Sequence, residues 1–309
     1  MLFCKKLGNK VNVLKIDKCP LCGNNRFEKA LECTDHYATG ESFFICRCRQ
    51  CGFLFTQGVP TEAEIGRYYE SPDYISHSDT NRGWTNRVYH WVRRFMLKRK
   101  VHLVKQSTGL SQGTLLDFGT GTGYFPHALQ QAGWKVTAIE KSPQARTFAA
   151  EHFQLDVLPP EALSSLPEAS FDAITLWHVL EHLEALNETW QELYRLLKPN
   201  GVLVIAVPNP NSYDATYYGA RWAAYDVPRH LWHFAPAILQ QFGVKHGFIM
   251  AERHPMPFDA FYISMITERN YQKRLPFLRG LWVGAKAWMA TLGKKERSSS
   301  MIYIFRKKK

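Results

Sequence analysis

A glycine-rich segment, LLDFGTGTGYF at residues 115–125, has the composition of a ligand-binding loop. Gly119, Gly121 and Gly123 alternate with other residues, and glycine allows a sharp turn and the close approach of a ligand to the backbone. The spacing is G-x-G-x-G, which differs from the G-x-G-x-x-G of dinucleotide sites. Asp117 stands at the mouth of the expected loop, where a carboxylate would repel a pyrophosphate. We therefore expect a cationic ligand that carries no phosphate.

A second carboxylate follows at Glu140, about 20 residues after the loop, where dinucleotide-type folds place an acid that binds ribose. Its two oxygens suit the two hydroxyls of a ribose. S-Adenosylmethionine combines a ribose with an ammonium group and a sulfonium and has no phosphate. We therefore expect it to be the cofactor.

Two Cys-x-x-Cys pairs, CPLCG and CRQCG, place Cys19, Cys22, Cys48 and Cys51 at the spacing of zinc knuckles. All seven cysteines lie within the first 51 residues. Because a cytosol keeps thiols reduced, such a cluster favours metal over disulfides. We expect one structural zinc ion, with Cys46 as an alternative to Cys48 and packing of the thiols as small apolar groups as the other reading.

Alternating strand and helix patterns must position these residues. They extend over residues 111–309 and predict an α/β fold with a doubly wound, Rossmann-like parallel sheet. The expected strands are 114–118, 135–140, 155–158, 171–177, 202–207, 248–252 and 301–305. The expected helices between them are 123–132, 143–153, 180–197 and 236–245.

Two smaller regions precede this domain. Residues 15–60 form the expected zinc-ribbon-like module, and residues 61–110 form a helical lid or linker with a short helix at 61–69 and a basic helix near 85–106. Tyr74 and His77 lie in the polar loop between these helices and can close over a bound cofactor. An ordinary linker is the equally weighted alternative.

Four segments resemble motifs of the class I S-adenosylmethionine-dependent methyltransferases, in the order of that family: LLDFGTGTGYF, VTAIEKS, FDAITLWHVLEHL and LLKPNGVLVIAVPN. The chain also resembles a bacterial group of such enzymes with an N-terminal Cys₄ knuckle and a DVPRHLWHF segment. The resemblance implies a seven-stranded sheet whose last strand is antiparallel. The cofactor contacts expected on this basis are Asp117, Gly119, Thr120, Gly121, Gly123, Tyr124, Phe125, Glu140, Lys141, Trp177 and His178.

The acceptor of the methyl group is expected at a substrate loop, residues 209–235, because ligands bind beyond the carboxyl ends of the strands in open α/β sheets. This loop combines aromatic and ionisable side chains, as binding pockets do. The alternative is that Trp222, Trp232 and Phe234 are anchors in the core and that the histidines lie on the surface. The expected acceptor contacts are Trp222, Tyr225, Arg229 and His233, together with Tyr74 and His77.

Methyl transfer to oxygen requires removal of the acceptor proton, for which histidine is suited. We expect His178 or His230 to be the base, with Asp226 to orient it. Transfer to nitrogen or carbon can proceed by positioning alone. The HVLEH stretch is also similar to an E-x-x-E-H stretch associated with a divalent metal in ubiquinone-pathway O-methyltransferases, but His178 replaces its first acid.

The net charge of +12 fits an anionic partner or a solvated basic surface. A small-molecule acceptor is the leading expectation, RNA or protein methylation is the alternative, and a non-catalytic binding module is disfavoured by the intact glycine loop. An amphipathic insertion at 256–298 contains a Trp-rich basic segment, 274–295, that can either cover the core or touch an anionic membrane. The first residues lack the apolar core of a signal peptide, so we expect a cytoplasmic protein.

Overall fold

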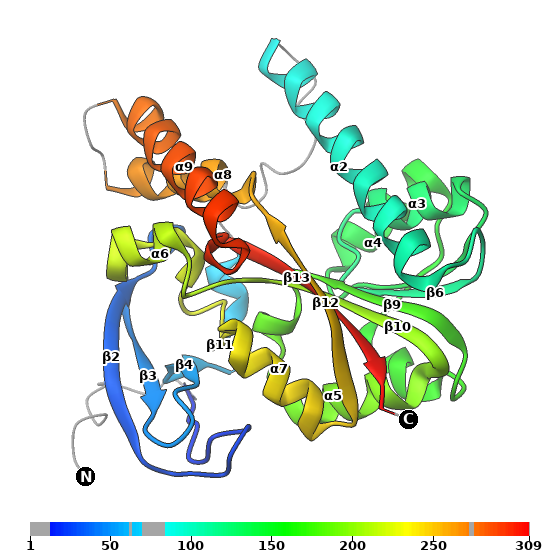
Figure 1. Ribbon diagram of the computed structural model, residues 1–309, viewed down its shortest axis with the longest axis horizontal. Coiled ribbons are helices and arrows are strands. Elements are labelled where there is room, and N and C mark those ends of the chain that lie inside the picture. Colours follow the sequence, from blue (N-terminus) through cyan, green and yellow to red (C-terminus); the bar gives the residue numbers. More distant parts are fainter. Residues whose placement is uncertain (1–12, 62–63, 70–83, 272–274, 309) are drawn as a thin grey trace.

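A twisted seven-stranded sheet forms the centre of the computed structural model, which describes residues 13–61, 64–69, 84–271 and 275–308 (Figure 1). The order of its strands is β12-β13-β10-β9-β6-β7-β8. Strands β6 to β10 pair in parallel, whereas β13 pairs antiparallel with both β10 and β12. The expected α/β fold with an antiparallel last strand is confirmed. The strands are β6 (Thr114–Phe118), β7 (Lys135–Ile139), β8 (Val157–Leu158), β9 (Phe171–Trp177), β10 (Leu197–Pro208), β12 (Phe248–Met256) and β13 (Ser300–Lys307).

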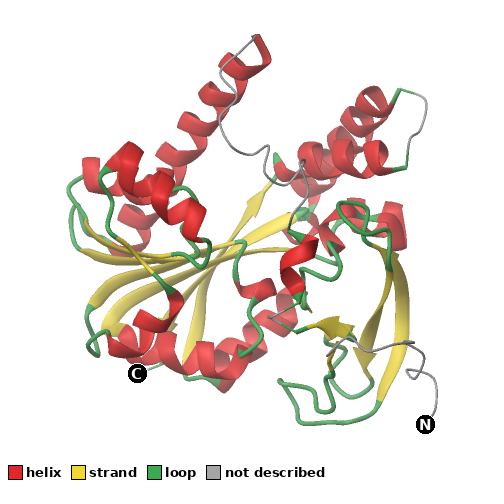
Figure 2. Cartoon of the chain, turned by 180° about the vertical axis from the view of Figure 1, so that it is seen from behind, coloured by secondary structure: helices red, strands yellow, loops and turns green. Residues whose placement is uncertain are grey.

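Helices cover both faces of this sheet (Figure 2). Consecutive residues of β6 show the alternation, since Leu115 packs with α2 and α3 on one face and Leu116 packs with α5 and α7 on the other. The helices are α2 (Trp84–Thr108), α3 (Tyr124–Gln131), α4 (Pro143–Phe153), α5 (Leu186–Leu196) and α7 (Pro236–Lys245). Short 3₁₀ turns are η1 (Ile65–Tyr68), η2 (Pro160–Ser165), η3 (Leu180–His182), η4 (Gly219–Arg221), η5 (Ala223–Tyr225) and η6 (Lys295–Arg297).

Two of the expected helices differ from the structure. The helix expected at 180–197 is divided into η3 and α5, because the backbone at 181 turns inward and its carbonyl accepts a hydrogen bond from the N–H of Leu231. The helix expected at 61–69 is only the 3₁₀ turn η1 in the residues that the structure describes. The division of the 180–197 helix therefore follows from a contact with a distant segment.

A second sheet contains the N-terminal region and one strand from the central domain. Its order is β11-β4-β3-β2, and all neighbours are antiparallel. The ring of Phe53 packs against Trp232, Phe234 and Phe242, so the N-terminal module shares its core with the central domain. The elements are β2 (Phe27–Thr34), β3 (Ser42–Cys48), β4 (Leu54–Gln57) and β11 (Trp232–His233), with a separate pair β1 (Val13–Leu14) and β5 (Val59–Pro60).

A helical hairpin connects β12 to β13 and extends away from the sheet (Figure 1). It consists of α8 (Asp259–Asn270) and α9 (Pro276–Gly293), and the short helix α6 (Tyr213–Tyr218) lies beside it. Among the described residues, no helix is both long enough and apolar enough to cross a membrane.

Candidate active site

The glycine-rich segment forms the turn between β6 and α3, at the carboxyl edge of the central sheet. Gly119 and Gly121 both have a positive φ, 76° and 57°. A Cβ atom at Gly119 would lie 2.4 Å from Cγ2 of Val179, so packing requires a glycine there. A Cβ atom at Gly121 would meet nothing within 4 Å. The backbone of Gly121 therefore borders open space, as the close approach of a ligand demands.

Glu140 lies next to this turn, directly after β7. Its Oε2 accepts a hydrogen bond from the backbone N–H of Gly121 at 2.7 Å, and its Oε1 accepts one from the N–H of Ser142 at 2.8 Å. Each carboxylate oxygen can accept a further hydrogen bond, and the side chain is only half-buried. Glu140 thus ties the loop to the start of α4 and retains acceptor capacity at the sheet edge. Lys141, the next residue, is exposed.

Asp117 lies beneath the loop and not at its mouth, which corrects the expectation from the sequence. It is part of β6 and faces Thr175 of β9 in the sheet register. Its Oδ1 accepts a hydrogen bond from the Thr175 hydroxyl and its Oδ2 accepts one from the Thr120 hydroxyl, both at 2.6 Å. Burial raises the pKa of Asp117, against the opposing effects of the two hydroxyls and of the Lys100 ammonium.

Lys100 of α2 reaches this region, although it was not among the site residues expected from the sequence. Its Nζ lies 4.3 Å from the centre of the Trp177 ring, and Phe125 packs edge-on against the same ring at 5.6 Å. Burial lowers the pKa of Lys100, while the charges of Asp117 and Asp259 act in the opposite direction. Only the packing of α2 over β9 reveals that this lysine belongs to the site.

Tyr124 lies at the start of α3, one residue before Phe125. Its ring packs against Phe153 at 4.9 Å, and the guanidinium of Arg93 lies 3.7 Å from the ring centre. Helix α2 therefore also covers the beginning of α3, beside the glycine loop.

His178 follows the last residue of β9 and has a positive φ of 56°. Its Nδ1 lies 3.5 Å from Oε1 of Glu181, and its Nε2 lies 3.6 Å from Oδ2 of Asp259. Burial alone would lower the pKa of His178, but the two carboxylates raise it to about 9. The side chain remains 35% exposed, so a bound molecule can reach the imidazole.

Glu181 is a fully buried carboxylate surrounded by imidazoles. Within the described part of the chain, neither of its oxygens has a hydrogen bond of good geometry, although Oε1 lies 3.5 Å from Nδ1 of His178. The Nδ1 of His182 lies 3.0 Å from the carbonyl oxygen of Arg229, and the Nδ1 of His230 lies 2.9 Å from that of Ala224. Because a carbonyl only accepts, both imidazoles donate through Nδ1. Glu181, His182 and His230 each offer an atom within 4.8 Å of the others, so these three side chains can also hold a metal ion.

Asp226 and Arg229 form the junction between the substrate loop and the N-terminal module. Arg229 is fully buried and pairs with Asp226 at 2.6 Å and Asp35 at 3.0 Å, and it donates to the carbonyl oxygen of Tyr68 at 2.7 Å. Asp226 Oδ2 also lies 3.8 Å from Nε2 of His230. These interactions pair the Arg229 charge with carboxylates inside the protein. They also hold the substrate loop against the N-terminal module.

The other loop residues expected to contact the acceptor are also buried at this junction. Trp222 donates through Nε1 to Asp214 at 2.7 Å, and Tyr225 packs edge-on against His233. His233 lies 3.0 Å from the Thr56 hydroxyl, and burial lowers its pKa to about 3, so it is neutral at physiological pH. The adjacent cavity of about 20 Å³ has room for a water molecule. The structure therefore supports the alternative for the aromatic residues, which are anchors in the core, whereas His230 and His233 are buried and do not lie on the surface. Tyr74 and His77 lie outside the described residues.

A larger cavity of about 360 Å³ lies between α2 and the ends of β12 and β13. Its volume lies within the range of small-molecule pockets. It borders Trp177 and Lys100, which connect it to the residues around the glycine loop. No local sequence pattern indicates it, because its walls come from segments about 150 residues apart. The walls include Phe95, Arg99, Lys100, Trp177, Met256 and Phe258.

The four expected cysteine ligands converge in the N-terminal module. The Sγ atoms of Cys19 and Cys51 lie 3.6 Å apart, and those of Cys22 and Cys48 lie 3.5 Å apart. All four sulfurs lie within 4.8 Å of one another. Tetrahedral zinc with bonds of about 2.3 Å separates its sulfur ligands by roughly 3.8 Å. The cluster therefore fits a zinc ion, and Cys46 is not among its members.

Comparisons with known proteins agree with this geometry. The model of a family described as a methyltransferase domain matches residues 88–252, just over half of the chain. The ubiquinone biosynthesis O-methyltransferase of Xanthomonas oryzae is 30% identical over 144 residues, 44% of this chain and 60% of that protein. The mitochondrial enzyme of the same name from Schizosaccharomyces pombe is 30% identical over 130 residues, 39% of this chain and 47% of that protein. The chain thus spans only about half the length of these curated relatives.

Solved structures show the same fold at low sequence identity. Phosphoethanolamine N-methyltransferase 2 from Haemonchus contortus, solved with S-adenosyl-L-methionine, has a TM-score of 0.51 and 17% identity over 92% of this chain and 69% of that chain. The PH0226 protein of Pyrococcus horikoshii has a TM-score of 0.50 and 15% identity over 78% of this chain and 98% of that chain. With the family match, the strand order and the glycine loop, this chain belongs to the methyltransferase-domain family and carries a class I S-adenosylmethionine-dependent methyltransferase domain.

Proposed function

We propose that the protein transfers a methyl group from S-adenosylmethionine to an oxygen atom of a small, largely apolar acceptor. The observation that carries this proposal is the cavity of about 360 Å³ beside Trp177 and Lys100. Its apolar walls suit the body of such an acceptor, and its cationic residues suit an acidic or phenolic group. The names of the curated relatives, ubiquinone biosynthesis O-methyltransferases, favour oxygen as the atom that is methylated.

The cofactor would be held by the glycine loop and by Glu140. The open backbone at Gly121 suits the amino-acid part of the cofactor, and the remaining lone pairs of Glu140 suit the ribose hydroxyls. Asp117 would act from beneath, since its buried charge favours a cationic ligand above the loop. When bound, S-adenosylmethionine supplies an electrophilic methyl group.

His178 would take the acceptor proton. Its imidazole is partly exposed, follows Trp177 directly in the chain and is bracketed by Glu181 and Asp259. As the acceptor oxygen takes the methyl group, the bond from the methyl carbon to the sulfonium sulfur would break with its electron pair left on sulfur, and the hydroxyl proton would pass to a ring nitrogen of His178. The two carboxylates stabilise the imidazolium that results. His230 lies behind Glu181, so we assign it the role of positioning that carboxylate, together with Asp226.

We also propose that Cys19, Cys22, Cys48 and Cys51 hold one structural zinc ion. Support comes from the four converging sulfurs and from the two turns, in which the N–H groups of Gly23 and Gly52 donate to the carbonyls of Cys19 and Cys48. Such turns bring two thiolates to one ion.

Incubation of the protein with methyl-labelled S-adenosylmethionine and a host extract tests the function. We expect label in a small-molecule or lipid fraction, and we expect Lys100→Met to reduce that label by at least about tenfold, since it changes the cavity next to Trp177. Lys135→Met, an exposed lysine on β7, is the control and should retain labelling. Label in RNA or protein would overturn the proposal and favour the alternative acceptors.

A further inference from the structure

The hairpin of α8 and α9 is packed in an unusual manner, with small residues inside and large apolar residues outside. The face of α9 toward α8 carries Gly280, Val283, Gly284, Ala287 and Thr291. A Cβ atom at Gly280 would lie 2.6 Å from the Cα of Met265, and one at Gly284 would lie 2.8 Å from the Cα of Phe261. The two helices thus approach each other through their glycines.

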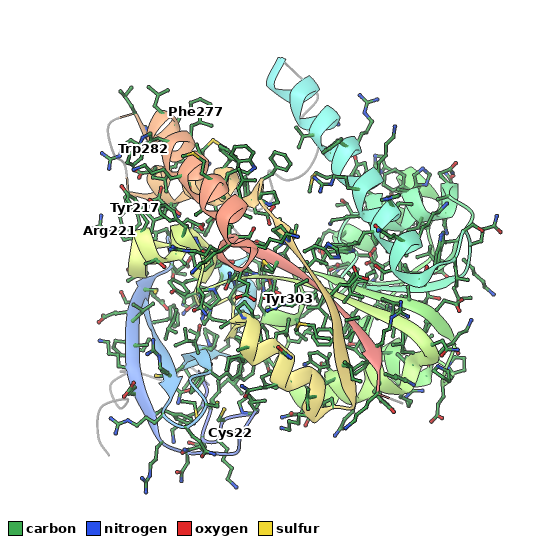
Figure 3. All side chains as sticks on the ribbon, viewed as in Figure 1. Cys22, Tyr217, Arg221, Phe277, Trp282 and Tyr303 are labelled. Atoms are coloured by element: carbon green, nitrogen blue, oxygen red, sulfur yellow. The ribbon has the colours of Figure 1, made fainter. Side chains whose placement is uncertain are left out.

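The outer face of α9 carries bulky apolar side chains. The side chains of Phe277, Leu278, Trp282, Met289 and Leu292 are between 53% and 68% exposed. Figure 3 shows Phe277 and Trp282 on the outer side of the hairpin, turned away from the central sheet. A soluble helix normally buries such residues and exposes polar ones, so this arrangement is reversed relative to packing in water. A contiguous apolar surface of this kind marks an interaction site.

Every charged side chain on α9 is positive. The helix contains no acidic residue, and Lys286 lies with its Nζ 3.7 Å from the centre of the Trp282 ring. Lys294 and Lys295 follow its end. Tyr217, which is nearly half exposed, packs edge-on against Trp282 and extends the surface onto α6. Trp, Tyr and Lys together are typical of segments that lie at a membrane–water interface.

We infer that the outer face of the α8–α9 hairpin binds the surface of an anionic lipid bilayer. The apolar side chains would enter the boundary between headgroups and acyl chains, and the lysines would meet the anionic headgroups. A second copy of the chain is a poorer partner, because its hairpin carries the same positive charge and the protein as a whole carries +12.

This docking would place the large cavity near the membrane. Phe258, which precedes α8, and Phe95 of α2 both line the cavity and are both nearly half exposed. Helix α2 and the hairpin extend from the same edge of the molecule (Figure 1). An acceptor that resides in the bilayer could therefore enter between them. This last step rests on the proposed function, whereas membrane binding does not.

Co-sedimentation of the full chain with lipid vesicles tests the inference. We expect binding to vesicles of phosphatidylcholine with phosphatidylglycerol, little binding to phosphatidylcholine alone, and weaker binding at high salt. Phe277→Ser with Trp282→Ser, and separately Lys286→Glu with Lys294→Glu, should each weaken binding by about tenfold or more. The matched control is Val244→Ser with Ile249→Ser, which alters exposed apolar residues on α7 and β12.

Equal binding by the wild type and both hairpin variants, with unchanged thermal unfolding, would overturn the inference. Sedimentation of a dimer that the Phe277→Ser, Trp282→Ser variant converts to a monomer would instead assign the surface to a second copy. Vesicle binding together with failure to label any small molecule would disprove the proposed acceptor and leave the membrane surface standing. Labelling of a small molecule without vesicle binding would disprove the membrane surface and leave the proposed acceptor standing.

Discussion

His178 illustrates how one residue acquires its chemistry from the groups around it. The sequence places a histidine directly after a buried strand, but its two carboxylate neighbours come from η3 and from α8. Because these carboxylates stabilise the imidazolium, they raise the pKa of His178 to about 9 despite the burial. The histidine is therefore mostly protonated at neutral pH, and it becomes a base only as the pH rises.

The pH dependence of methyl transfer should follow this titration. We expect kcat/KM to rise with pH and to level off above about pH 9, since only the neutral imidazole accepts a proton. Asp259→Asn removes one carboxylate, lowers the pKa of His178, and should move the rise to lower pH. Formation of S-adenosylhomocysteine, followed as a function of pH, measures both profiles.

Glu32→Gln is the control for this experiment. It removes the carboxylate from a surface pair in which Glu32 lies 2.7 Å from Lys29, and it should leave the profile unchanged. Superimposable profiles for the wild type and Asp259→Asn would show that His178 is not the titrating base.

Among the elements, the α8–α9 hairpin depends on the close approach of two helices. Glycine at 280 and 284 is unfavourable for an isolated helix, so its presence has a packing reason. That reason is visible only in the structure, where the backbone of α8 occupies the space that a side chain on α9 would need.

Gly284→Ala should therefore destabilise the protein by about 1–3 kcal/mol, because the new Cβ would overlap backbone that cannot move aside. Gly293→Ala is the matched control. It lies at the end of α9 with no atom within 4 Å of an added Cβ, and it should change stability by less than about 0.5 kcal/mol. Urea unfolding of the three proteins measures the difference. A loss for Gly284→Ala no larger than that for the control would contradict the packing.

At the scale of the whole molecule, the N-terminal module and the methyltransferase domain share a core. The boundary drawn near residue 60 from the sequence separates segments that are joined in space. Strand β11 pairs with β4, and the buried Arg229 pairs with Asp35 across the junction. The region expected to bind an acceptor instead connects the module to the domain.

Removal of zinc should therefore weaken the entire chain. We expect the purified protein to contain about one zinc per chain. A strong chelator should lower the temperature of a single cooperative unfolding transition in calorimetry, since the sheet next to the proposed zinc site extends into the common core. Cys19→Ser with Cys48→Ser should have the same effect. A small separate transition for the module, with the main transition unmoved, would show that the two parts are independent.

Much of the fold was predictable because it depends on local periodicity. The bounds of β6, β9, α4 and α7 agree with those expected. Buried strands and amphipathic helices each have a pattern of apolar residues that can be recognised within a short segment. The seven-stranded sheet and the antiparallel β13 followed from the resemblance of four motifs, whereas the order of the strands is known only from the structure. The prediction of one continuous helix over 180–197 was wrong. The backbone turns inward at residue 181 because its carbonyl accepts a hydrogen bond from residue 231, and no local pattern contains that contact.

By itself, the sequence determined the glycine loop, the acid after β7 and the four converging cysteines, because each depends on spacing over a few residues or on a single turn. Only the tertiary structure decided which charged residues meet. It buried Asp117 beneath the loop, brought Lys100 to Trp177, surrounded Glu181 with imidazoles and used Arg229 to join two regions. Those contacts link segments up to 194 residues apart, and their energies depend on burial and distance, which a linear pattern does not contain.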